Sequence, residues 1–153
     1  MSAHILHDVK FKDSDVPCGF CLNEGGLCII KLITTSKGTT IDMKNSQCPC
    51  IRKLTIKTAA RFSKESPCTN HPLNCPLCPK TSPAVWKYNL RSHIISQHPT
   101  ATIDLYQHLF KLLDEESTLM KAIYQTVPRK SKKRNIIAPL PISDGHSTRM
   151  ALR

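Results

Sequence analysis

Four residues near the middle of the chain have the types and spacing of a metal site: Cys75, Cys78, His93 and His98. The two cysteines share one tight turn, so both thiolates can reach the same ion. Fourteen residues separate Cys78 from His93, where about twelve are usual, and four separate the histidines. Two thiolates with two imidazoles favour Zn²⁺, and a closed set of four protein ligands is typical of a structural ion. We therefore predict a Cys-Cys-His-His-like zinc finger over 73–99.

The second half of this finger is expected to be a helix that begins at 82–83, where a serine hydroxyl and a proline favour a helix start. In fingers that read bases, residues near the helix start face the major groove. Asn89 is then placed to pair with adenine, and Lys87 and Arg91 lie near phosphates. Trp86 suits packing better than base reading, so sequence-specific reading by this finger alone is weakly indicated.

A second short pair, Cys18 and Cys21, opens a cysteine-rich segment that we assign to a zinc module over 17–72. Spacing nearly forces both into one site, and Gly19 permits the tight turn between them. We choose Cys48 and Cys68 as the other two ligands, because each ends an expected element beside a proline. The chain is thus expected to hold two structural zinc ions.

The choice of ligands in the first site is not settled by spacing, because three further residues are also candidates. Cys28 alternates with apolar residues in an expected strand, so a buried core thiol is its predicted role. Cys50 and His71 are reserve ligands. Any of the three can replace a chosen ligand, and the spacing does not decide among them.

The elements around these ligands favour a small α+β zinc-stabilised fold. We expect strands at 28–33 and 40–43 joined by a turn at 36–39, then a helix at 56–62. A cysteine knuckle, a hairpin and a helix are typical of a treble-clef or ribbon module. The finger and a long C-terminal helix are expected to follow it.

An ordered series of motifs covers residues 17–99. These are Pro17-Cys-Gly-Phe-Cys21, Ser46-Gln-Cys48-Pro49, Pro67-Cys68-Thr-Asn70, Cys75-Pro-Leu-Cys78-Pro79, Trp86-Lys-Tyr-Asn-Leu90 and His98-Pro99. The series resembles a group of fungal proteins, mostly from mushroom-forming fungi, that carry a Cys-Cys-His-His-like finger. The resemblance implies zinc binding, and it groups Cys18, Cys21, Cys48 and Cys68 as one ligand set. Cys50 and His71 are local departures from the group.

The flanking segments have other compositions. Residues 1–16 are expected to form a flexible arm. Residues 100–127 are expected to form one amphipathic helix with an apolar stripe, which ends before Pro128. The default expectation is that this helix packs on the zinc modules of its own chain. The stripe is wider than a small finger can cover, so a protein partner or a homodimer is the alternative. Residues 128–153 lack periodicity and are expected to be a basic disordered tail.

The charge indicates the kind of partner. The chain carries a formal net charge of +11 and has a pI near 9.5, a balance that attracts polyanions. The tail contains a dense basic block that can serve as a nuclear localisation signal or a phosphate-binding strip. Its members are Arg129, Lys130, Lys132, Lys133 and Arg134. A second basic patch lies on the first module, at Arg52, Lys53, Lys57, Arg61 and Lys64.

These observations favour a nuclear, DNA- or RNA-binding protein or regulator with structural zinc. The alternative is a protein-interaction adaptor that uses the C-terminal helix. An enzyme is not expected, because each ligand set closes at four donors and no nucleophile-elbow, phosphate-loop or metalloprotease motif occurs. No secretory leader and no apolar run of about 18 residues is visible, so we expect neither secretion nor membrane insertion. No small-molecule substrate is expected.

Overall fold

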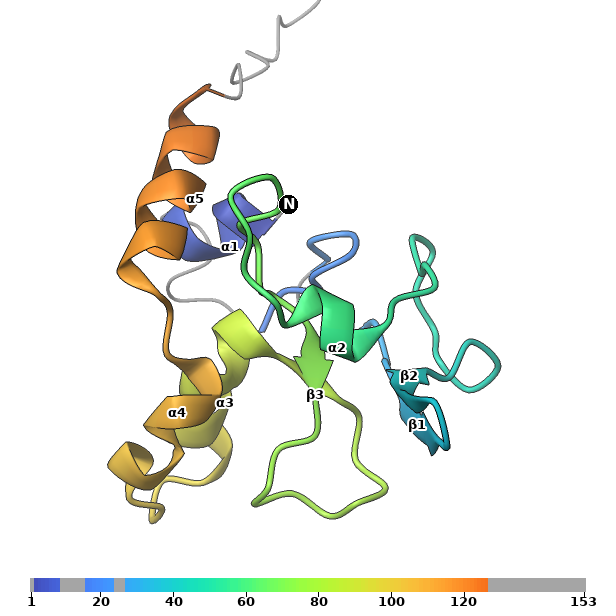
Figure 1. The fold of residues 1–153 in the computed structure, drawn as a ribbon. Coiled ribbons are helices and arrows are strands. Elements are labelled where there is room, and N and C mark those ends of the chain that lie inside the picture. The colour runs from blue at the N-terminus through green and yellow to red at the C-terminus, as the bar shows by residue number, and fades with distance from the viewer. Residues whose placement is uncertain (1, 9–15, 24–26, 127–153) are drawn as a thin grey trace, which may run out of the picture.

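The computed structural model describes residues 2–8, 16–23 and 27–126 (Figure 1). The helices are α1 (Ser2–His7), α2 (Ile56–Ala59), α3 (Leu90–Gln97), α4 (Gln107–Phe110) and α5 (Asp114–Thr126), with 3-10 helices at Lys87–Asn89 and Ile103–Tyr106. The strands are β1 (Leu32–Thr35), β2 (Gly38–Ile41), β3 (Pro72–Leu73) and β4 (Val85–Trp86). They form two small antiparallel hairpins, β1–β2 and β3–β4. The fold is thus small α+β, as the sequence predicts.

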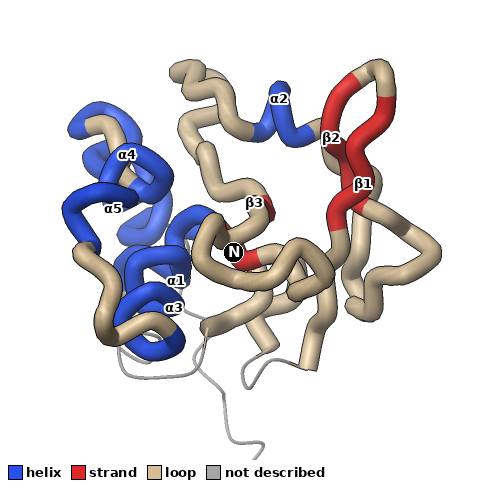
Figure 2. The backbone as a smooth tube through the Cα atoms, turned by 90° about the horizontal axis from the view of Figure 1, so that it is seen from below, coloured by secondary structure: helices blue, strands red, loops and turns tan. Residues whose placement is uncertain are grey.

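The β1–β2 hairpin forms where expected, but β1 begins later than the expected strand at 28–33, and β2 begins earlier than the expected strand at 40–43. Leu32 pairs with Ile41 and Thr35 with Gly38, whose φ of +118° closes the turn. The preceding residues belong to a different pairing, because Ile29 and Gln47 exchange both backbone hydrogen bonds, at 3.0 and 2.7 Å. The two chain segments that flank the hairpin therefore also pair with each other, at Ile29 and Gln47. Figure 2 shows this hairpin on the side of the molecule away from α4 and α5.

Strand β4 joins two hydrophobic clusters. Its neighbouring side chains point to opposite faces, as in any strand. Trp86 packs with Cys18, Ile30 and Ile41 in the first cluster. Val85 packs with Leu90 and Ile94 in the second. The expected first module and the finger thus share one strand between their cores.

The finger helix begins later than predicted. Residues 85–86 are extended because they pair with β3, in the register Pro72 with Trp86. Helical structure starts with the 3-10 helix at Lys87, and α3 itself starts at Leu90. The serine–proline start at 82–83 is therefore wrong, since strand pairing outweighs the local preference of these residues.

The segment 100–127 is not the single helix that its apolar stripe suggests. It contains the 3-10 helix, α4, an extended break at Lys111 with ψ of 131°, and α5. The two halves pack against different surfaces. Tyr106 and Phe110 pack on the second cluster, whereas α5 lies beside α1 and buries Met120 (Figure 1).

Residues 2–7, expected as part of a flexible arm, form α1. Ala3 and Ile5 are buried, and the His4 ring meets the Tyr124 ring edge-on with centroids 5.3 Å apart. Within the expected arm, residue 1 and residues 9–15 lie outside the described residues, as does the basic tail 128–153 with the block Arg129–Arg134. Among the described residues, no helix is long and apolar enough to cross a membrane.

Candidate metal centres

The finger ligands meet as predicted. The ligand atoms of Cys75, Cys78, His93 and His98 all lie within 4.8 Å of one another. Cys78 Sγ is 3.3 Å from His93 Nε2 and 3.2 Å from His98 Nε2. Cys75 Sγ is 3.7 Å from His98 Nε2. We call this group the second centre, and it can hold a metal ion.

Both histidines come from the end of one helix. His93 lies within α3, and His98 caps it with φ of −135° and ψ of 59°. Leaving helical angles at His98 allows a ring five residues beyond His93 to turn toward the same point. The His98 backbone amide still donates to the Ile94 carbonyl at 2.9 Å, so the last turn stays closed. Leu90 and Ile94 of the same helix are buried in the second cluster, which also contains Cys75 and Cys78.

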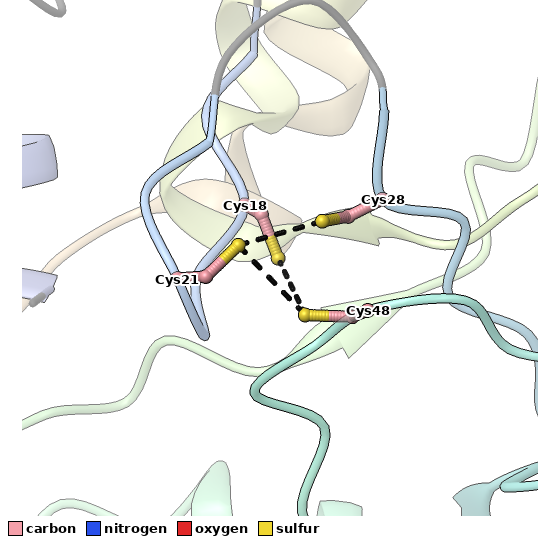
Figure 3. A group of neighbouring side chains, drawn as sticks. All are labelled: Cys18, Cys21, Cys28 and Cys48. Carbon is pink, nitrogen blue, oxygen red and sulfur yellow. Dashed lines mark hydrogen bonds between the residues drawn. The ribbon is translucent and has the colours of Figure 1, made fainter.

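Four cysteines form the first centre: Cys18, Cys21, Cys28 and Cys48. Figure 3 shows their sulfur atoms pointing toward one another from three separate chain segments. The Sγ–Sγ distances are 3.8 Å for Cys18 with Cys48, 3.8 Å for Cys21 with Cys48 and 3.4 Å for Cys21 with Cys28. All four ligand atoms lie within 4.8 Å of one another.

This arrangement corrects the ligand set chosen from the sequence, because Cys28 stands where Cys68 was expected. The Ile29–Gln47 pairing brings Cys28 beside Cys48 from the two arms of the hairpin. The sulfur of Cys68 instead lies 3.8 Å from the Tyr88 hydroxyl oxygen. The two reserve ligands are also not part of the first centre. Cys50 is exposed, and His71 Nδ1 lies 2.8 Å from the Thr69 carbonyl oxygen.

In the turn at Cys18–Cys21, the role of Gly19 differs from the predicted one, which was to permit the tight turn. The left-handed residue of the turn is Leu22, with φ of 62°. The Leu22 amide donates to the Cys18 carbonyl, at 2.8 Å, and the Cys18 amide donates to the Asn23 carbonyl, at 3.0 Å. A Cβ on Gly19 would overlap the indole ring of Trp86. Gly19 is therefore needed for close packing against the first cluster.

The electrostatics of both centres favour a bound cation. Burial raises the pKa of the Cys28 thiol far above its usual value and that of Cys48 to about 11, with the charge of Cys18 adding to both shifts. Burial, together with the charge of Cys75, also raises the pKa of Cys78. Burial and the neighbouring His98 lower the pKa of His93. The pKa of Cys21 is lowered despite its burial, by hydrogen bonds to the Asn23 backbone and to the neighbouring thiols. A bound cation would favour the ionised form of the thiols whose pKa is raised, Cys28, Cys48 and Cys78.

The spacing of the donors fits a tetrahedral ion. A Zn–S bond of about 2.3 Å places two sulfurs about 3.8 Å apart, and a Zn–N bond of about 2.0 Å places sulfur and nitrogen about 3.5 Å apart. The distances in both centres lie close to these values. The two centres also border one hollow of about 360 Å³, lined by ligands of both.

The residues proposed for base and phosphate contacts on the finger are mostly used inside the fold. Asn89 is buried, and its side-chain amide donates to the Pro17 carbonyl at 2.7 Å. Lys87 donates to the Thr69 hydroxyl at 2.6 Å and lies 3.9 Å from Glu116. Neither is presented to a DNA groove, which corrects their predicted roles. Arg91 is exposed on α3.

The second basic patch, in contrast, is exposed to solvent. Its five residues lie on α2 and its flanks, and all are exposed: Arg52, Lys53, Lys57, Arg61 and Lys64. None of them forms an ion pair within the part of the chain that the structure describes. We call these five residues the basic row.

Comparison with known proteins adds no assignment: no protein-family model, curated protein or solved structure matches this chain. The resemblance of residues 17–99 to fungal finger proteins therefore stays a prediction. What the structure defines is a small α+β protein with two clusters, each able to hold a metal ion. One cluster has four cysteines, and the other has two cysteines and two histidines.

Proposed function

We propose that this chain is a nuclear nucleic-acid-binding protein built on two structural zinc ions. The observation that carries the metal assignment is the pair of closed donor sets, each with four ligand atoms within 4.8 Å of one another. Thiolate and imidazole donors in tetrahedral spacing suit Zn²⁺ better than hard cations. Four protein donors leave no position for a reactive water, which supports a structural role and not an enzymatic one.

The basic row supports nucleic acid as the partner. Its cations have no acidic partner within the described residues, and Glu65 is the one acidic residue between positions 43 and 103 of the sequence. An uncompensated cluster on one surface attracts the phosphates of a nucleic acid and releases their counterions on binding. The basic block Arg129–Arg134 supports nuclear import and further phosphate contact.

The test is a comparison of two charge-matched variants. One replaces all five members of the basic row with glutamine. The other replaces five exposed lysines elsewhere, Lys37, Lys44, Lys80, Lys111 and Lys121, and so has the same net charge. Binding to a labelled oligonucleotide is followed by fluorescence anisotropy over a salt series, with both variants loaded with zinc.

We expect the basic-row variant to lose about tenfold or more in affinity at 0.1 M salt and to show a shallower dependence on salt, because fewer counterions are released. The control variant is expected to keep most of its affinity. Equal losses in both variants would assign the binding to net charge alone. Absence of binding by the unaltered protein at low salt would refute the function.

A protein-interaction adaptor is the second candidate, and exposed leucines favour it. Leu105 is 68% exposed and Leu113 is 53% exposed, on the segment that connects the second centre to α5. Replacing both with glutamine should abolish self-association or partner binding while zinc content is unchanged. The mass of the unaltered protein, measured by light scattering over a range of concentrations, tests the homodimer directly.

A further inference from the structure

A hollow of about 390 Å³ adjoins the basic row. Lys53 belongs to both, because it is a member of the row and also lines the hollow. The wall is formed by α2 and by residues just before β3, including Ser66 and Asn70. A phosphate bound by the basic row therefore lies next to a space that can receive the rest of the nucleotide.

The polar wall of the hollow has unused hydrogen-bonding groups. Thr55, Thr58 and Ser66 line it, and their hydroxyls make no hydrogen bond with any other described residue. Thr55 uses only its backbone in the α2 turn, where its carbonyl accepts from the amides of Thr58 and Ala59. A hydroxyl both donates and accepts, so these three can meet either kind of group on a ligand edge.

The remaining wall is apolar. Leu54 and Ala59 line the hollow and are half-buried, so their methyl groups face part of the space. Leu54 also packs against the first cluster, which fixes its position. A flat ring with apolar faces and polar edges matches this combination of walls, and an unpaired nucleobase has that character.

We propose that the hollow receives an unpaired nucleobase of a single strand whose phosphates lie on the basic row. The inference rests on the proposed function and specifies its ligand as single-stranded nucleic acid. In a duplex the base edges are paired, so a base enters the hollow only after it is unstacked and unpaired. The protein therefore prefers single strands to duplex of the same sequence.

The finger does not present its helix start to the bases of a duplex. The start of its helical segment is occupied by Asn89, which is buried, and by Lys87, which is bonded to Thr69. Helix α2, which carries part of the basic row, has only four residues and is too short to follow a major groove. The charged surface and the hollow are thus the parts of the described fold that face a nucleic acid.

Ala59→Leu tests the hollow without changing charge. Leucine suits a helix and fills the space with a larger side chain. Its matched control is Ala60→Leu, because Ala60 is the exposed neighbour and does not line the hollow. Affinities of zinc-loaded proteins are measured for DNA and RNA single strands of one sequence and for the corresponding DNA duplex.

We expect the unaltered protein and Ala60→Leu to bind a single strand about tenfold more tightly than duplex, because a duplex must first unstack and unpair the base that enters the hollow. Ala59→Leu should bind both equally, with its duplex affinity unchanged. Tighter binding of DNA or of RNA identifies the natural strand, and either result supports the proposal. A single-strand preference that persists in Ala59→Leu would overturn it, as would equal affinities in the unaltered protein.

Two further measurements separate the possible failures. If Ala59→Leu loses zinc or does not melt cooperatively, Thr55→Val with Thr58→Val removes two hydroxyls with little change of shape, and it should give the same loss of preference. If the basic-row variant loses affinity but no hollow variant alters the preference, the proposed function stands and this inference fails. If the basic-row variant keeps its affinity, the proposed function fails first.

Discussion

The carboxylate of Glu116 accepts two hydrogen bonds from Thr69, at 2.9 Å from its backbone amide and at 2.6 Å from its hydroxyl. Glu116 is fully buried on α5, and the Tyr88 hydroxyl also donates to it. Lys87 lies 3.9 Å from its other oxygen. A residue of the C-terminal helix therefore holds the segment between the two metal centres in place.

Replacing Glu116 with alanine should destabilise the zinc-loaded protein by about 3 kcal/mol, because three donors and the Lys87 ammonium lose a buried partner. Urea denaturation measures the change. The matched control is Glu115→Ala, since Glu115 is exposed on the same turn of α5. Equal effects of the two substitutions would contradict a structural role for the buried carboxylate.

His71 should make stability depend on pH. Burial, with the nearby charge of Lys87, lowers its pKa, against the opposing effects of the Thr69 carbonyl and Glu116. As pH falls, the unfolded chain binds the proton first, at about 6.5. The associated stability is therefore complete above that pH and is lost as pH falls toward the folded pKa.

His71→Asn should remove this component. We expect the unaltered protein to lose stability more steeply between about pH 7.5 and 5.5 than the variant does, with both saturated with zinc. The metal ligands are the same in both proteins, so the difference between the two profiles reports His71. Parallel profiles would contradict the assignment.

Gly19→Ala should destabilise the first centre by about 1 to 3 kcal/mol, because the added methyl group overlaps the Trp86 ring. Competition with a chromophoric zinc chelator measures the weaker binding. The same substitution in a Trp86→Leu background should cost less, since the ring that it meets is gone. An equal cost in both backgrounds would place the effect in the turn itself.

The sequence predicted the parts of the fold that short-range signals determine. The pairs Cys18–Cys21 and Cys75–Cys78 have the spacing of metal-binding turns, and the hairpin is marked by its turn at Gly38. The paired histidines were also predicted to share one site, and both lie near the end of one helix in a group that can hold a metal ion.

What the sequence missed depends on contacts between distant residues. Strand alternation assigned Cys28 to the core, but the Ile29–Gln47 pairing turns its segment toward Cys48. The sequence did contain one signal for this pairing: residues 28 and 48 flank the hairpin, one on each side. Asn89 was assigned to base reading, yet it bonds to Pro17, 72 residues away. The helix at 100–127 breaks because Phe110 and Glu116 pack on different parts of the molecule.

The most direct test of the two-centre account is zinc stoichiometry by native mass spectrometry. The unaltered chain should retain two zinc ions, Cys28→Ser should retain one, and Cys68→Ser should retain two. Cys78→Ser is the matched loss at the second centre and should also retain one. Retention of two ions by Cys28→Ser, with loss of one by Cys68→Ser, would contradict the first centre as described.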